Sequence, residues 1–242
     1  MRFTSEQRLD DGVLEREFTL GEIPGTLWTP GSAPAPAPLI LIGHNGGLRT
    51  REPRLMARAR HSAAEYGYAV AAIDAPGHGD RPRSAGEERI RADLRRAKES
   101  GEPIDEILEA LIAPLVDRAV PEWQTTLDAL LSLPGIGGPV GYSGMTAIGI
   151  RLAVVEPRIA AAGFFAGGFV PSALREEARQ VTIPLLFLLQ WDDEGNDRRL
   201  ALDLFDAFGS GEKTLHANVG GHTGTPWFEV DDGNRFFDRH LK

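Results

Sequence analysis

Three stretches of the sequence hold residue types that can carry out nucleophilic catalysis together. Ser143 lies in GYSGM, His222 in NVGGH, and several acids lie in QWDDEGND. A serine hydroxyl becomes a nucleophile when a base removes its proton, and an unperturbed imidazole titrates in the range that suits this task. An acid then orients the imidazole and stabilises its charged form. From the residues alone, the acid could be Asp192, Asp193, Glu194 or Asp197.

The stretch around Ser143 differs from the usual signature of a nucleophilic serine. That signature is Gly-x-Ser-x-Gly, on a sharp turn from a strand to a helix. Gly141 occupies the first glycine position, but Met145 stands where the second glycine is expected. We expect Ser143 on such a turn, with the strand and helix slightly separated to accommodate Met145. A glycine-rich turn without a catalytic role is the alternative.

Backbone donors for a developing oxyanion are expected after the apolar run LILIGHNGG. Small residues just beyond a strand let a substrate carbonyl approach the N–H groups. We expect the oxyanion to be held by the N–H of Gly46, or of Asn45, together with the N–H of Gly144.

Two competing interpretations concern the same residue types. His78, in DAPGHGDRP, also follows a predicted strand and is the rival base. The acidic stretch could cap the next helix, because carboxylates are favourable at a helix N-terminus. A metal site is disfavoured because the sequence has no second cluster of carboxylates, so no metal and no cofactor are expected.

The order of apolar runs and helical patterns predicts the fold class. Buried strands near LILI, YAVAAI, GPVGYS, IAAAGFF and PLLFLL alternate with helical segments, which indicates a mostly parallel sheet covered by helices on both faces. Such sheets bind ligands at the carboxyl ends of their strands. The stretch PEWQTTLDALLSLPG predicts a helix that begins at its proline. Residues 84–119 break the alternation and predict a small helical insertion, either a cap above the strand ends or a lengthened crossover.

Composition limits the classes of protein further. The chain has 242 residues, a net charge of −9 and no cysteine, so disulfides and a cysteine nucleophile are excluded. The negative charge argues against binding to nucleic acid or an anionic membrane. No apolar run reaches the roughly 18 residues of a membrane helix, and the charged N-terminal stretch does not resemble a signal peptide. We expect a single domain over residues 1–242, cytoplasmic, acting on a small molecule.

Taken together, GHNGG, DAPGHGDRP, GYSGM, WDDEGND and GGH resemble the α/β-hydrolase fold, in particular compact serine esterases related to dienelactone hydrolases. The resemblance places the acid at Asp193, in the chain order serine, acid, histidine. It implies an esterase that forms an acyl-enzyme on Ser143 and cleaves a carboxylic ester, a thioester or a lactone. Dienelactone hydrolases proper use a cysteine nucleophile, which this chain lacks, so their substrate is not carried over.

Two further hypotheses remain open on the same scaffold. A non-catalytic protein that binds a small ligand is suggested by Met145, by Asn45 and by the altered acidic segment. A hydrolase acting on C–C bonds, or a cofactor-free perhydrolase, would use the same three residues.

Overall fold

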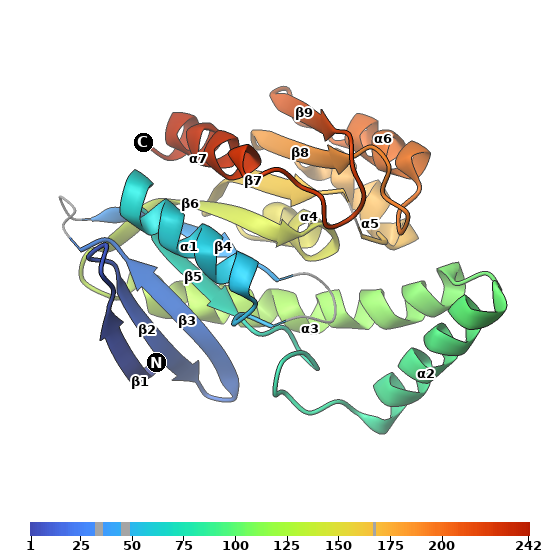
Figure 1. Cartoon of the computed structure of the whole chain (residues 1–242), viewed down its shortest axis with the longest axis horizontal. Coiled ribbons are helices and arrows are strands. Elements are labelled where there is room, and N and C mark those ends of the chain that lie inside the picture. The colour runs from blue at the N-terminus through green and yellow to red at the C-terminus, as the bar shows by residue number, and fades with distance from the viewer. Residues whose placement is uncertain (32–35, 45–48, 167) are drawn as a thin grey trace.

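A nine-stranded sheet forms the centre of the molecule (Figure 1). The structure is a computed structural model that describes residues 1–31, 36–44, 49–166 and 168–242. The strands lie in the order β1-β2-β3-β5-β4-β6-β7-β8-β9. Their bounds are β1 (Arg2–Arg8), β2 (Leu14–Leu20), β3 (Ile23–Thr29), β4 (Ala37–Ile42), β5 (Ala69–Ile73), β6 (Ile136–Met145), β7 (Ile159–Phe165), β8 (Leu185–Gln190) and β9 (Lys213–Asn218).

Helices cover both faces of this sheet. The helices are α1 (Pro53–Tyr66), α2 (Ala85–Ser100), α3 (Asp105–Leu131), α4 (Thr146–Val155), α5 (Ser172–Glu177), α6 (Arg198–Ala207) and α7 (Phe228–Leu241), with a short 3-10 turn at Ala178–Gln180. Helices α1 and α7 contact each other on one face, whereas α3, α4 and α6 lie on the other (Figure 1). The predicted mostly parallel sheet with helices on both faces is therefore confirmed.

Strand direction determines which end of the sheet can hold a site. The first three strands are antiparallel, and β3 pairs with β5 in the same antiparallel sense. From β5 across β4, β6, β7, β8 and β9 every pairing is parallel. The carboxyl ends of these six strands therefore meet at one edge, where open parallel sheets bind ligands.

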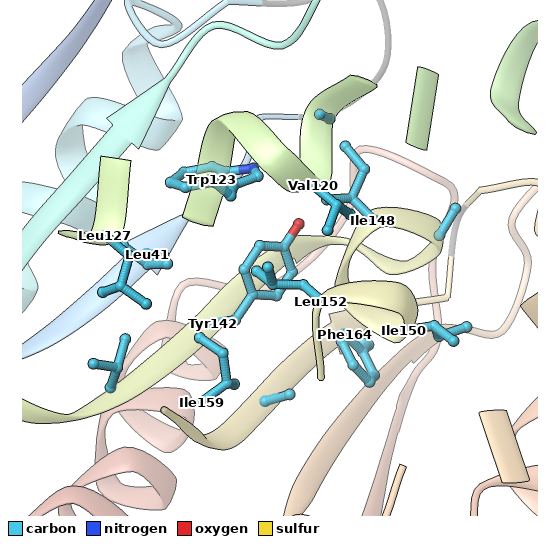
Figure 2. Packing of buried hydrophobic residues seen from close by; sticks show 14 of the residues in the cluster. Leu41, Val120, Trp123, Leu127, Tyr142, Ile148, Ile150, Leu152, Ile159 and Phe164 are labelled. Carbon is cyan, nitrogen blue, oxygen red and sulfur yellow. The ribbon is translucent and has the colours of Figure 1, made fainter. Parts of the chain in front are cut away.

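Alternating side chains divide the core into two layers. Along β4, Leu39 and Leu41 enter the cluster on the α3 and α4 side, whereas Ile40 and Ile42 enter the cluster on the α1 and α7 side. Strand residues alternate between faces, so a strand that is apolar throughout must be covered twice. Figure 2 shows the first layer, in which Trp123 of α3 meets the Tyr142 ring of β6 edge-on at a centroid distance of 6.1 Å.

The predicted start of the helix at Pro121 is wrong. Helix α3 runs continuously over 27 residues and contains Pro114 and Pro121 in its interior. A proline inside a helix removes one backbone hydrogen bond and costs about 3 kcal/mol. Buried residues on both sides of Pro121, including Val116, Val120 and Trp123, keep the helix packed across the interruption.

The helical insertion predicted at residues 84–119 is present. It consists of α2 and the first half of α3, and α3 itself is the crossover helix that leads to β6. Helix α2 begins at a capping box, in which Ser84 and Glu87 exchange hydrogen bonds with each other's backbone N–H. It ends at Gly101, whose φ of 70° is left-handed.

Within the described chain, no helix combines the length and the apolar character needed to cross a bilayer.

Candidate active site

Ser143 lies inside a strand and not on a sharp turn. Strand β6 continues for two residues beyond it, to Met145, and α4 begins at Thr146. Ser143 pairs with Ile42 of β4 and Gly163 of β7. Ser143 is extended as part of β6, and among the described residues only glycines have a positive φ. The expected strand-to-helix turn at Ser143 is therefore wrong. Because β6 remains paired with β7 through Met145, helix α4 begins only at Thr146.

Close contacts explain two of the glycines near Ser143, Gly141 and Gly144. A Cβ on Gly144 would lie 2.7 Å from both Cα and N of Gly43 at the end of β4. A Cβ on Gly141 would lie 2.7 Å from the Phe237 ring of α7. Gly141 is thus required by a helix on the opposite face from α4. Gly163, next to Ser143, leaves 3.6 Å between its would-be Cβ and the serine Oγ.

Among the described residues, the hydrogen-bond partner of the Ser143 hydroxyl is an arginine. Nη2 of Arg58, on α1, donates to Ser143 Oγ at 3.1 Å. Burial lowers the pKa of Arg58 from its usual value, and the neighbouring charge of Arg54 lowers it further, whereas Glu52 acts in the opposite direction. Arg58 was not predicted from the sequence, because an arginine beside the buried stripe of a helix resembles an ordinary solvated side chain.

His222 contacts one acid through its ring. Nδ1 of His222 and Oδ2 of Asp193 are 2.8 Å apart, and the Asp193 side chain is 2% exposed. Because a carboxylate only accepts, Nδ1 donates and the lone pair of Nε2 is left to act as a base. The second oxygen of Asp193 accepts from the N–H of Gly195 at 2.8 Å.

The other acids of this loop have different contacts. Oε2 of Glu194 accepts from the backbone N–H of His222 at 3.2 Å and does not contact the ring. Its own backbone N–H, followed by that of His222, lowers the pKa of Glu194. Asp197 caps the N-terminus of α6, as the competing interpretation of the acidic stretch expected. Asp192 is exposed.

Two neighbours fix the loop that carries His222. Arg54 of α1 donates to the carbonyl oxygen of Thr223 at 3.3 Å and to that of Thr225. Nε2 of Gln190, at the end of β8, donates to the carbonyl oxygen of Gly221 at 3.2 Å. The His222 ring also meets the Phe165 ring edge-on at a centroid distance of 5.5 Å. The histidine therefore lies between the ends of β7 and β8.

The rival histidine is engaged elsewhere. His78 is 2% exposed, and its Nδ1 lies 2.9 Å from the carbonyl oxygen of Pro76. Burial lowers the pKa of His78 to about 4, so the ring is neutral at pH 7. His44 accepts the N–H of Ala75 at 3.0 Å through Nε2. Both rings stabilise the ends of β4 and β5.

Ser143 and His222 line one cavity of about 240 Å³ between the strand ends and helices α1 and α7. Its apolar wall includes Leu55, Leu186 and Phe237. Within the described part of the chain, no hydrogen bond joins Ser143 Oγ to His222. The histidine and the acid of the site are therefore hydrogen-bonded to each other. The serine lies in the same cavity, but its Oγ is hydrogen-bonded to Arg58.

Of the expected oxyanion donors, Gly144 lines this cavity. Asn45 and Gly46 lie outside the described residues, as do the neighbouring positions 47 and 48.

A second cavity of about 460 Å³ lies beneath α2 and α3. Leu94 of α2 and Leu108 of α3 line it, together with Gly144, Met145 and His222 from the strand ends. The insertion therefore adjoins the same histidine from the other side. Its role as a cap remains a prediction.

One group among the described residues has the spacing of metal ligands. Ligand atoms of His216, Glu229 and Asp232 lie within 4.8 Å of one another. Each already has a protein partner, since His216 Nδ1 lies 2.8 Å from Glu229 Oε2 and Asp232 pairs with Arg235 at 2.6 Å. These contacts explain why the three side chains lie together: they link β9 to α7.

Comparison with solved structures gives full-length matches to esterases. A cold-adapted esterase from an Arctic intertidal metagenomic library, bound to PEG, is 30% identical over 100% of both chains, with a TM-score of 0.79. Its native structure matches over the same lengths at 28% identity and a TM-score of 0.73. An acetyl xylan esterase from Paenibacillus sp. R4 is 14% identical over 99% of this chain and 88% of its own, with a TM-score of 0.71. No protein-family model and no curated protein matches.

The parallel strands, their covering helices and these full-length matches define the α/β-hydrolase fold. At 30% identity over its whole length, the chain belongs to the same family as the cold-adapted Arctic esterase. The narrower resemblance to dienelactone hydrolases remains a prediction from the sequence.

Proposed function

We propose that the protein is a serine hydrolase that cleaves a carboxylic ester through an acyl-enzyme on Ser143. The observation that carries this proposal is the His222–Asp193 pair, 2.8 Å apart, whose histidine lines the same cavity as Ser143. Ester hydrolysis is favoured over other acyl transfers because the 30%-identical relative is an esterase. Thioesters and lactones contain the same electrophilic carbonyl and remain within the proposal.

Each residue has one role in the proposed reaction. The Oγ–H proton of Ser143 passes to Nε2 of His222 while Oγ bonds to the carbonyl carbon. The N–H groups of Gly144 and of Gly46 or Asn45 hold the oxyanion. The leaving alcohol takes the proton from His222, and water then releases the acid by the same steps. Asp193 orients the imidazole and stabilises its charged form.

The reaction requires Ser143 and His222 to meet. The hydroxyl proton of Ser143 is available, because Arg58 donates to Oγ and leaves the O–H bond free. Residues 220–225, which carry His222, are held by side-chain contacts from Arg54 and Gln190 and by backbone contacts. In the proposed reaction the Ser143 side chain rotates toward Nε2 of His222, which lines the same cavity. No cofactor is involved in the proposed chemistry, and the cytoplasmic location expected from the sequence remains part of the proposal.

Hydrolysis of p-nitrophenyl esters of graded acyl length tests this function. Wild-type protein should show saturable hydrolysis, and Ser143→Ala should lose it by about 10⁴-fold or more, because a serine triad acts as a unit. Ser132→Ala, at the exposed C-terminal end of α3, is the matched control and should retain activity. Equal rates for wild type and Ser143→Ala would contradict the proposal.

A second candidate, a non-catalytic protein that binds a small ligand, is favoured by one observation. Ser143 is extended, and its Oγ is bonded to Arg58 and not to His222. This candidate would be preferred if wild-type protein turned over no acyl substrate while wild type and Ser143→Ala bound the same ester with equal affinity by calorimetry.

A further inference from the structure

Among the described residues, Arg58 is the side chain that hydrogen-bonds to Oγ of Ser143, the proposed nucleophile. It projects from α1 into the cavity, where its Nη2 donates to Ser143 Oγ at 3.1 Å. A guanidinium has donors and no acceptor, so it binds a lone pair of the oxygen and leaves the hydroxyl proton for a base. This contact is therefore compatible with His222 taking that proton.

The charge of Arg58 has no carboxylate partner among the described residues. No aspartate or glutamate in that part of the chain lies within 4.0 Å of its guanidinium, whereas 13 arginine–carboxylate ion pairs occur among the other described residues. Glu52 raises the pKa of Arg58 through its charge, but its side chain caps α1 by accepting from the N–H of Leu55 at 2.8 Å. Arg54 adds a second positive charge beside it.

Part of the cavity wall around this charge is apolar, although Glu52, Arg54 and Glu229 also line the cavity. Leu55, Leu186 and Phe237 line the same cavity and are buried. A cation that is partly removed from water interacts more strongly with a neighbouring charge than an exposed one does. The electrostatic stabilisation of such a cation is largest when a negative charge forms close to it. The cavity is therefore prepared for an anion next to Ser143.

The proposed reaction produces such an anion at this place. When Oγ bonds to the carbonyl carbon, the π electron pair moves to the carbonyl oxygen, and the proton of the hydroxyl moves to His222. The new oxyanion is two bonds from Oγ, within reach of a donor that already contacts Oγ. On collapse the electron pair returns, the bond to the leaving oxygen breaks, and that oxygen takes the proton from His222.

We propose that Arg58 is a catalytic residue whose guanidinium stabilises the negative charge that develops on the reacting oxygens when Ser143 attacks. This inference rests on the proposed function. It adds a side-chain cation to the backbone N–H groups expected to hold the oxyanion. Preorganised donors aimed at a developing charge lower the barrier because they act more strongly on the transition state than on the substrate.

Substitution of Arg58 tests the proposal through the separate effects on kcat and KM. Arg58→Met keeps most of the aliphatic stem and removes the charge, and it should lower kcat for p-nitrophenyl acetate about 10²-fold to 10³-fold. KM should change by less than about 3-fold, because the lost interaction is made in the transition state. Arg58→Lys should recover part of kcat.

Two further measurements separate catalysis from a structural effect. Free guanidinium ion at millimolar concentration should raise kcat of Arg58→Met several-fold and leave wild type unchanged. Arg60→Ala removes another arginine of α1, one that pairs with Glu15 at 2.8 Å outside the cavity, and should retain wild-type kcat. Circular dichroism and the unfolding midpoint check that each variant is folded.

The outcomes distinguish this inference from the proposed function. If wild type shows no Ser143-dependent turnover, the proposed function fails and the inference fails with it. If turnover depends on Ser143 but Arg58→Met raises KM alone, Arg58 binds the ground state and the inference is wrong. A faster Arg58→Met variant would also overturn it, by showing that the contact restrains Ser143. So would a slow, folded variant that guanidinium does not rescue and that Arg58→Lys does not restore.

Discussion

Replacement of Asp193 by asparagine isolates the electrostatic contribution of the acid. Asparagine has nearly the same shape, so the loop should remain folded, but it has no charge and can donate toward Nδ1. In the protein, Oδ2 of Asp193 lies 2.8 Å from Nδ1 of His222, and the acid is 2% exposed. The imidazolium that forms during attack on the ester would lose its counter-charge.

The magnitude follows from Coulomb's law at this geometry. Two unit charges about 4 Å apart interact by about 4 kcal/mol at an effective dielectric constant of 20. Each 1.36 kcal/mol in the barrier changes the rate tenfold, so the full interaction corresponds to about 10³-fold. The His222 side chain is 34% exposed, and water screens part of the interaction. We therefore expect kcat of Asp193→Asn to fall by about 10²-fold to 10³-fold.

The assay compares kcat for p-nitrophenyl acetate among three variants of the same loop. Asp193→Asn should show the large loss. Glu194→Gln and Asp192→Asn should stay within about 3-fold of wild type, because the Glu194 carboxylate accepts from backbone N–H groups and not from the His222 ring, and Asp192 is exposed. A loss in Glu194→Gln or Asp192→Asn that equals or exceeds the loss in Asp193→Asn would refute the assignment of the acid.

Three further predictions concern stability. Leu127→Ala should lower the free energy of unfolding by about 2–5 kcal/mol in urea titration, since Leu127 is 0% exposed in the core of Figure 2, and a loss below 1 kcal/mol would contradict this packing. Gly144→Ala should cost about 1–3 kcal/mol, because its Cβ would lie 2.7 Å from the backbone of Gly43, whereas Gly86→Ala in α2 meets nothing closer than 3.7 Å and should be neutral or stabilising. Burial lowers the pKa of His78 to about 4 in the folded protein, whereas the unfolded chain has the usual histidine pKa of about 6.5. Between these two pH values the unfolded chain binds a proton at this ring and the folded chain does not. The free energy of unfolding should therefore fall through this window by roughly 3 kcal/mol on account of His78, and His78→Asn should fall that much less; parallel curves for the two proteins would show that the ring is not held neutral.

Sequence patterns predict the buried strands of this fold well, because a strand covered on both faces must be apolar at successive positions. The run at Leu39–Ile42 is recognisable for this reason. Strand β1 was not predicted, since RFTSEQR is exposed at every position and therefore lacks an apolar pattern. The interior position of Pro121 was also missed, because a local breaking signal was overcome by packing along the whole of α3.

Some residues of the candidate site could be predicted from local sequence patterns, whereas others depend on contacts between distant parts of the chain. Ser143, near the carboxyl end of β6, and His222, after β9, could be predicted to lie close together because strand ends converge at one edge of the sheet. The contact between Arg58 and Ser143 joins positions 85 apart in the chain, and nothing in the local pattern of α1 distinguishes Arg58 from a solvated arginine. The extension of β6 through Met145 likewise depends on pairing with β7 and on the close approach of Gly144 to Gly43.

Covalent labelling by a fluorophosphonate tests the central claim most directly, because the reagent modifies a serine that a neighbouring base has activated. Intact-mass spectrometry of wild-type protein should show one adduct, mapped to Ser143, and Ser143→Ala should show none under the same conditions. Labelling should slow in Asp193→Asn and remain unchanged in Glu194→Gln. An unlabelled wild-type protein, or an adduct that persists in Ser143→Ala, would contradict the assignment of Ser143 as the nucleophile of an esterase.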